Sequence, residues 1–595
     1  MRLIILSICI LITLSIAAQD ANLVILHTND IHSKLTGYAP EIEYSPLKIN
    51  NDKTLGGFAR IASIIKAEKQ KFGNNILVVD AGDFLMGSFF HMLEPVNGLQ
   101  LQLMGQAGYD VVSIGNHEFD NGPGDLATII NKSKEKSQIP QLCLSNIEFD
   151  DKDPADDELE KLFNDSVIVP YTIIERAGLR IGVFALLGYD ATEVALYTDP
   201  VKILDPIKTA KKTSKYLKKD KGVDFVVCLS HSGVSPGKSG NWEGEDVKLA
   251  KKAKYIDVII SGHTHSVLSE VVWENDIPIV QTGAYGQFVG RLELEIKAGK
   301  ISFAQYKLIQ VNDQILGNRD IHEQIDQQKQ LLNDAFLNDL NIKYDEPVVE
   351  TDFDLVCNEH EPNNSNLGPL LADAIHYYVN KNSDEGTDIA LIATGLIRDN
   401  MKKGDTGLQT ASDLFRIVSL GLGDDPIPGY PLAKVYLTPV EIKRVVEILL
   451  AISPSNTAAY CYYSGMEVEI DMSKGFMKKV QKIIINDKEL NLSKKNNELY
   501  SLSASIYMLE SIGVIKKMTF GIIKVEPKDK NGNIYKDFGS TWIDFDTSKP
   551  GTQEGKEWLA LLEFAKSFKD TDGNGIPNIP EYYKTPRLVF KFINN

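Results

Sequence analysis

Five short segments of the chain carry residue types that bind metal ions, and each follows directly on an apolar run. They supply Asp30 and His32 in TNDIHS, Asp83 in DAGDFLMGS, Asn116 and His117 in GNHEFD, His231 in SHSG, and His263 and His265 in SGHTH. Imidazole together with carboxylate and amide oxygen suits Zn, Mn or Fe(II), whereas a set of oxygen ligands alone would suggest Mg or Ca. Two such ions about 4 Å apart can hold a hydroxide for in-line attack on phosphorus. The pattern therefore predicts phosphoester hydrolysis.

The apolar runs that precede these segments have the length of buried strands. Strands are expected at 23–27, 76–80, 111–114, 141–144, 181–187, 225–230, 258–261 and 279–282. Amphipathic stretches at 58–70 and 205–219 lie between some of them, and this alternation predicts an α/β sheet with parallel pairing. Parallel strands deliver their carboxyl ends to one edge, so the five segments should converge. Any one Asp-x-His or His-x-His alone is more often an ordinary surface or core pair.

Five motifs in this part of the chain resemble the calcineurin-like metallophosphoesterases, and more fully their 5′-nucleotidase and UDP-sugar hydrolase branch. They are Asp-x-His at 30–32, Gly-Asp at 82–83, GNHEFD at 115–120, His231, and GHTH at 262–265. TLGGFARIAS at 54–63 is also similar to that branch. The resemblance implies an N-terminal four-layer αββα sandwich, a linking helix, and a mixed α/β C-terminal substrate domain of the 5′-nucleotidase type.

The resemblance also implies two divalent ions that share the carboxylate of Asp83. One ion would be held by Asp30, His32, Asp83 and His265, and the other by Asp83, Asn116, His231 and His263. The ions would be of the Zn, Mn, Fe or Co type.

His117 is outside that ligand set, and the resemblance makes it the catalytic histidine, oriented by Asp120. An imidazolium beside the reacting phosphate can stabilise negative charge or donate a proton to the leaving group. A carboxylate partner raises the histidine pKa and fixes its tautomer. The alternative for Asp120 is a capping or loop acid, and no role is assigned to Glu118.

With 595 residues the chain is too long for a single hydrophobic core, so several domains are expected. The boundaries predicted are 22–318 for the catalytic domain, 319–345 for a polar linking helix, and 346–595 for the substrate-binding domain. Helices are expected at 366–380 and 438–452 in the last of these. Thr438 is a good N-cap there, and Pro439 suits the first helical position.

Two residues of the second domain are candidates for binding the substrate. Arg398, in ALIATGLIRDN at 390–400, stands where the family has an Asn-Gly-Gly-Gly-Ile-Arg segment, and guanidinium suits phosphate by its bidentate fork. The alternative is a surface charge. The family's Pro-Phe-Gly segment, whose Phe stacks on the base, is replaced by IVSLGLGDD at 417–425 without an aromatic. Tyr507 is therefore the remaining candidate for stacking.

The segment DTDGNGIPNIPE near the C-terminus fits the calcium-loop pattern D-x-D-x-N-G-x5-E. The candidate calcium ligands are Asp570, Asp572, Asn574, Asn578 and Glu581. A plain turn rich in Asp, Asn and Gly is the alternative. A calcium ion in this loop would be structural.

Residues 1–18 have the layout of a secretory signal peptide, with Arg2, an apolar run from 3 to 16, and small residues at Ala17 and Ala18. A membrane anchor is the alternative, but the run is shorter than the roughly 20 residues that span a bilayer. Export to the periplasm or the extracellular space is expected, with no transmembrane segment after cleavage. The formal net charge of −18 argues against nucleic-acid polymers as partners.

These observations predict an exported, metal-dependent phosphoester hydrolase whose partner is a small-molecule phosphate ester. The expected substrates are 5′-nucleotides, UDP-sugars or cyclic nucleotides, hydrolysed by a metal-held hydroxide. One alternative keeps the dinuclear centre but acts on a non-nucleotide phosphate or a sulfur ester. Another is a secreted binding protein that uses the fold as a scaffold.

Overall fold

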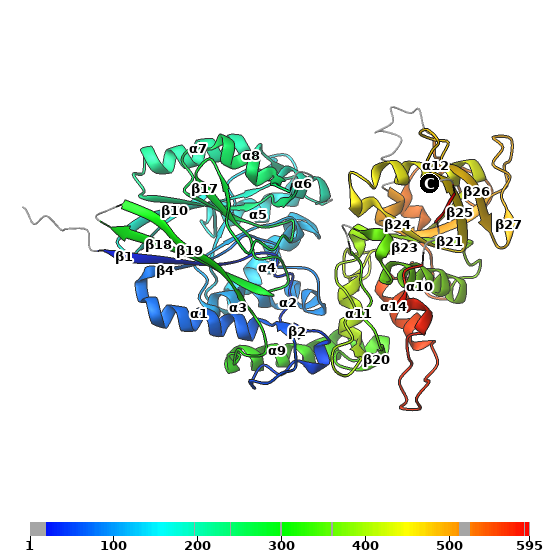
Figure 1. Ribbon diagram of the computed structural model, residues 1–595, viewed down its shortest axis with the longest axis horizontal. Helices are drawn as coiled ribbons and strands as arrows, with labels where there is room; N and C mark the ends of the chain where they lie inside the picture. The colour runs from blue at the N-terminus through cyan, green and yellow to red at the C-terminus, as the bar shows by residue number, and fades with distance from the viewer. Residues whose placement is uncertain are drawn as a thin grey trace, which may run out of the picture.

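The computed structural model describes residues 20–195, 197–237, 240–297, 300–358, 361–510, 524–587 and 590–593. The segment predicted to be a signal peptide, 1–18, lies outside the described residues. Two α/β units lie side by side, with the first half of the chain in one and the remainder in the other (Figure 1). In the part of the chain that is described, no helix is long and apolar enough to cross a membrane.

The first unit is built on two sheets whose central strands are parallel. The seven-stranded sheet has the order β19 (Lys300–Gln310), β18 (Phe288–Lys297), β1 (Ala21–Thr28), β4 (Ile76–Asp80), β5 (Val111–Ser113), β6 (Gln141–Cys143) and β8 (Ile168–Val169). The six-stranded sheet has the order β16 (Val272–Glu274), β17 (Ile277–Val280), β15 (Val258–Ser261), β12 (Phe225–His231), β10 (Leu179–Leu187) and β9 (Tyr171–Arg176). All eight strands predicted from the sequence are present.

Side chains that alternate along the strands build the layers of the first unit. In β1, Leu23 and Ile25 pack into the core between the two sheets, whereas Val24 and Leu26 pack toward helices. The helices on that outer face are α1 (Phe58–Phe72), α3 (Leu99–Ala107) and α4 (Gly122–Lys136). The other sheet is covered by α7 (Pro206–Lys219) and α8 (Glu245–Lys252). The result is the predicted αββα sandwich.

A polar helix, α9 (Arg319–Leu332), follows the first unit and occupies the predicted linking segment. It buries only Ile321, Ile325 and Leu332, which lie on one face, and it packs against α1 and the 3-10 turn Phe89–Leu93. The domain limits at 318/319 and 345/346 stay predictions.

The second unit has a four-stranded sheet with the order β23 (Leu432–Leu437), β28 (Tyr500–Ser505), β21 (Ile389–Ala393) and β24 (Cys461–Ser464). The predicted helices are present as α10 (Leu367–Asn382) and α12 (Pro439–Ile452). Thr438 precedes α12 as expected. Its backbone amide donates a hydrogen bond to the carboxylate of Glu441 at 2.9 Å. A further helix, α14 (Glu557–Lys566), packs against α10.

Apolar and charged contacts join the two units. The ring of Phe89 lies 4.2 Å from that of Phe415 and 5.3 Å from that of Trp558, measured between centroids. Buried Lys34 places its ammonium 2.7 Å from the carboxylate of Asp399, which neighbours Arg398. The ion pair of Lys34 with Asp399 holds the loop after β21 against the first unit.

Candidate metal centre

The predicted ligands converge at one edge of the two sheets. They lie at or just after the carboxyl ends of β1, β4, β5, β12 and β15, which are the strands expected to deliver them. Five of them are buried: Asp30, His32, Asp83, Asn116 and His231. Buried carboxylates and imidazoles without a compensating charge are costly, so this cluster indicates a site for cations.

The first group consists of Asp30, His32 and His265, whose ligand atoms all lie within 4.8 Å of one another. Nε2 of His32 is 3.0 Å from Nε2 of His265 and 3.9 Å from Oδ1 of Asp30. Nε2 of His265 is 3.6 Å from the same oxygen. Three ligand atoms thus face one point, as a bound divalent ion requires.

The second group consists of Asp83, His231 and His263, with Asn116 beside them. Nε2 of His231 is 3.0 Å from Oδ2 of Asp83 and 3.1 Å from Oδ1 of Asn116. Nδ1 of His263 is 3.1 Å from that same amide oxygen. Oδ2 of Asp83 is also 3.9 Å from Nε2 of His32, so Asp83 lies between the two groups.

The backbone is strained at the residues that form these groups. Non-glycine residues rarely adopt a left-handed conformation, and they do so mainly where the surrounding structure imposes it at functional sites. The φ angles are 51° at Asp30, 52° at His32, 55° at Asp83, 75° at His263 and 53° at His265. This concentration of unfavourable backbone geometry supports a functional role for the cluster.

The outer ring nitrogens of three histidines have fixed partners. Nδ1 of His231 is 2.8 Å from the carbonyl of Ala81, and Nδ1 of His32 is 3.3 Å from the carbonyl of Leu85. Nε2 of His263 is 3.0 Å from the carboxylate of Asp190. Such partners fix the tautomer, so that the opposite nitrogen is free to bind a metal ion. The set of donors therefore fits divalent cations of the Zn, Mn or Fe type.

His117 and Asp120 lie beside this cluster as a hydrogen-bonded pair. Nδ1 of His117 is 2.7 Å from Oδ2 of Asp120, and the backbone amide of His117 donates to Oδ1 of Asp83 at 2.9 Å. Burial alone would lower the pKa of His117, but Asp120 and Asp83 raise it above its ordinary value. The imidazole is therefore suited to act in its protonated form.

Glu118 has a structural role that the sequence did not reveal. It is buried, and its carboxylate accepts hydrogen bonds from the amides of Gly115 at 2.6 Å, Asp83 at 3.0 Å and Leu85 at 2.9 Å. Burial, followed by the charge of Asp83, raises the pKa of Glu118 to about 8. Glu118 thus joins two ligand-bearing loops that are distant in the sequence.

The second unit brings Arg398 close to the cluster. Burial lowers the pKa of His265, and the charge of Arg398 is the next largest cause. The hydroxyl of Tyr285, in the first unit, donates to the carbonyl oxygen of Arg398. The predicted phosphate-binding arginine therefore lies at the boundary of the two units, on the side of the metal-ligand groups.

Tyr507 stacks on Tyr430, a residue that the sequence did not single out. Their ring centroids are 5.2 Å apart and their planes are inclined by 27°. Burial raises the pKa of both tyrosines, and Asp120 adds to that effect in each case. The pair therefore lies near the His117–Asp120 dyad. Segment 417–425 has no aromatic, as expected, and Tyr430 in the following PGYP sequence provides one.

The candidate calcium loop forms a compact turn. Asp570 accepts hydrogen bonds from the amides of Gly573 and Gly575, and Asn578 accepts one from the amide of Thr571. Within the described parts of the chain, Asp570, Asp572 and Glu581 do not gather into a metal-ligand group. Asn574 instead donates to Glu350 at 2.7 Å. Calcium binding here stays a prediction.

Comparisons with known proteins agree with the fold and with phosphoester hydrolysis. Residues 23–267 match the family model of calcineurin-like phosphoesterases, and residues 344–510 match that of the 5′-nucleotidase C-terminal domain. The chain belongs to the calcineurin-like phosphoesterases that carry this second domain, and it is a phosphoester hydrolase. Calcineurin-like phosphoesterases use divalent metal ions. The alternative of a binding protein without catalysis is therefore wrong.

The individual relatives have low sequence identity to this chain. The chain is similar to the trifunctional nucleotide phosphoesterase YfkN of Bacillus subtilis, with 27% identity over 75% of this chain and 29% of that protein, so it spans under a third of that relative. It is also 27% identical to a snake venom 5′-nucleotidase of Gloydius brevicauda, over 69% of this chain and 68% of the other. The fold resembles that of a 5′-nucleotidase precursor from Thermus thermophilus, with a TM-score of 0.65 and 21% identity. The alignment covers 94% of this chain and 100% of the other.

Proposed function

We propose that the protein is an exported nucleotidase that releases phosphate from 5′-nucleotides at a dinuclear metal centre. The observation that carries the proposal is the joint placement of Arg398, the Tyr430–Tyr507 pair and the His117–Asp120 dyad around the metal-ligand groups. A phosphate ester with an aromatic base needs a cation for the phosphate, an acid at the ester oxygen and a flat apolar surface for the base. The two sequence relatives are named as a nucleotide phosphoesterase and a 5′-nucleotidase, which supports nucleotides as the class of substrate.

Each predicted ligand receives a role in this proposal. Asp30, His32 and His265 would hold one ion, Asn116, His231 and His263 would hold the other, and Asp83 would contribute to both. The ions would supply positive charge to the phosphoryl oxygens and activate the attacking water. The choice among Zn, Mn, Fe and Co is part of the proposal.

The protein groups act on the leaving group and on the phosphate. Because Nδ1 of His117 is bonded to Asp120, its Nε2 is the atom that can donate a proton to the departing oxygen. Arg398 binds the phosphate through its guanidinium. The base would stack on Tyr507, the half-buried member of the tyrosine pair, whose ring packs against that of Tyr430.

Export is supported by two observations. The first residues of the chain have the charge and apolar run of a signal peptide. One of the relatives is a venom protein by its name. We propose cleavage near Ala18 and a periplasmic or extracellular location.

A substrate panel tests the proposal. Purified protein, loaded in turn with Zn, Mn, Co or Mg, would be assayed for hydrolysis of AMP, UDP-glucose, a 2′,3′-cyclic nucleotide, an aryl phosphate and an aryl sulfate. We expect AMP to be hydrolysed with the highest kcat/KM. Hydrolysis of the aryl phosphate alone would keep the metal centre and refute the nucleotide assignment, and preferred hydrolysis of the sulfate would favour the sulfur-ester alternative.

A further inference from the structure

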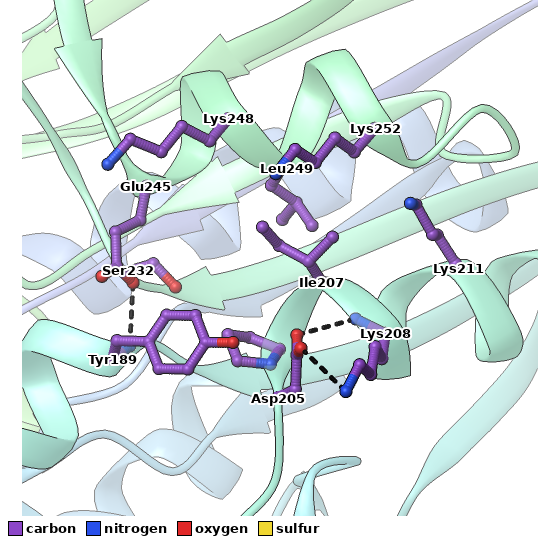
Figure 2. A pocket seen from close by; sticks show the side chains of 11 residues that line it. Tyr189, Asp205, Ile207, Lys208, Lys211, Ser232, Glu245, Lys248, Leu249 and Lys252 are labelled. Atoms are coloured by element: carbon purple, nitrogen blue, oxygen red, sulfur yellow. Dashed lines mark hydrogen bonds and ion pairs between the residues drawn. The ribbon is translucent and has the colours of Figure 1, made fainter.

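A cavity of 560 Å³ lies between α7 and α8, on the outer face of the six-stranded sheet. Its size falls within the range of sites that bind small organic molecules. Its floor is apolar, because Ile207 of α7 and Leu249 of α8 lie between the two helices, as Figure 2 shows. No residue predicted from the sequence to be functional lines it.

Lysines surround the floor on both sides. Figure 2 shows Lys248 and Lys252 extending from α8, while Lys208 and Lys211 extend from α7. Among the described residues, only Lys208 of these four has an ion-pair partner, which is Asp205. A gathering of unneutralised lysines is unexpected in a chain with a formal net charge of −18.

Both acids that line the cavity have partners other than Lys211, Lys248 and Lys252. Asp205 accepts a hydrogen bond from the amide of Lys208 at the start of α7. The carboxylate of Glu245 accepts from the amides of Tyr189 at 2.8 Å and Asp190 at 3.2 Å. Neither acid therefore neutralises Lys211, Lys248 or Lys252, and the rim keeps its positive charge.

We propose that this cavity is a second binding site, which takes an organic anion with an apolar body. The apolar floor would hold the body and the three unpaired lysines would bind the anionic group. The proposal does not depend on which ester the protein hydrolyses.

The same cavity is connected to the metal centre through a short series of contacts. Glu245 fixes the backbone amide of Asp190, and the carboxylate of Asp190 lies 3.0 Å from Nε2 of His263. A ligand that displaces Glu245 moves Asp190, and with it the partner that orients His263. Occupation of the cavity is therefore coupled to metal binding, a consequence that rests on the metal centre proposed above.

Binding is tested with 8-anilinonaphthalene-1-sulfonate, which combines an apolar body with an anionic group and fluoresces when bound. The variant Lys211→Gln/Lys248→Gln/Lys252→Gln should raise the Kd of the probe about tenfold or more. The control Lys212→Gln/Lys215→Gln/Lys254→Gln removes the same charge from lysines outside the cavity and should leave the Kd within about twofold. Equal effects in the two variants would refute the site. Competition by inorganic sulfate at the same concentration as the probe would refute the role of the apolar floor.

Coupling is tested by measuring the Kd of the same probe in metal-free and Mn²⁺-saturated protein. Linkage requires that metal and probe change each other's affinity by the same factor, which we expect to be about fivefold or more. In Asp190→Ala the probe should have the same Kd in metal-free and in Mn²⁺-saturated protein. Identical Kd values for the wild-type protein with and without Mn²⁺ would refute the coupling, while the lysine variants continue to test the site by themselves.

Discussion

His117 is bound to Asp120 through Nδ1, at 2.7 Å, and this leaves Nε2 as the only ring nitrogen that can reach a substrate. The two residues are three positions apart, and they are held in this relationship by the 3-10 turn His117–Phe119. Because the backbone amide of His117 also donates to Asp83, the dyad is anchored to the residue that lies between the two metal-ligand groups. Hydrogen bonds thus connect the His117–Asp120 dyad to the predicted metal ligands.

Asp120→Asn should move the pH profile of the enzyme. Asp120 raises the pKa of His117, so its loss lowers that pKa. If His117 acts protonated, kcat/KM falls as the pH rises through this pKa, and in the variant that fall should begin at lower pH. A profile of kcat/KM against pH for AMP measures the shift. Asp125→Asn removes a charge from the neighbouring helix α4 and should leave the profile unchanged.

Glu118→Gln should destabilise the protein while leaving every predicted ligand side chain in place. The amide nitrogen of glutamine cannot accept a hydrogen bond, so at least one of the buried amides of Gly115, Asp83 and Leu85 loses its acceptor. An unsatisfied buried donor costs about 1–3 kcal/mol. Chemical unfolding would measure this loss, and Glu135→Gln at the exposed end of α4 is the matched control. A variant as stable as the wild type would show that Glu118 does not join the two loops.

His27 should make the protein less stable at mildly acidic pH. It is fully buried in β1, and burial lowers its pKa from 6.5 to about 3. Below pH 6.5 the unfolded chain binds a proton here and the folded protein does not, so stability falls as the pH decreases. Between pH 7 and pH 5 the loss from this residue is about 2 kcal/mol.

His27→Phe removes that contribution. The free energy of unfolding should then depend less on pH between 7 and 5 than it does in the wild type, by about 2 kcal/mol over the interval. Unfolding by urea at the two pH values measures both slopes. Equal slopes for variant and wild type would contradict a neutral buried histidine.

The strands and the ligand positions could be predicted because both leave local signals. β4 (Ile76–Asp80) and β15 (Val258–Ser261) are buried, mainly apolar runs with the predicted ligands Asp83 and His263 a few positions after them, and the structure places their ends as expected. Parallel pairing then brings such ends to one edge, whatever the length of the connections between them.

Other parts of the site depend on contacts that no local pattern encodes. Glu118 matters because two other loops place their amides against it, and Asp190 because α6 (Tyr189–Val194) begins beside His263. Tyr430 gains its place by stacking on Tyr507, 77 positions further along the chain. Sequence can suggest the type of each residue, but only the packed fold shows what each one touches.

The central claim is that His117 acts on the substrate while the surrounding residues hold the metal ions. Its most direct test is to measure bound Mn²⁺ and the kcat for AMP in the wild-type protein and in His117→Ala. The variant should still bind two equivalents of metal, and its kcat should fall by about 10²-fold or more, which is typical of a lost general acid. Turnover equal to that of the wild type, in protein that retains its metal, would contradict the account.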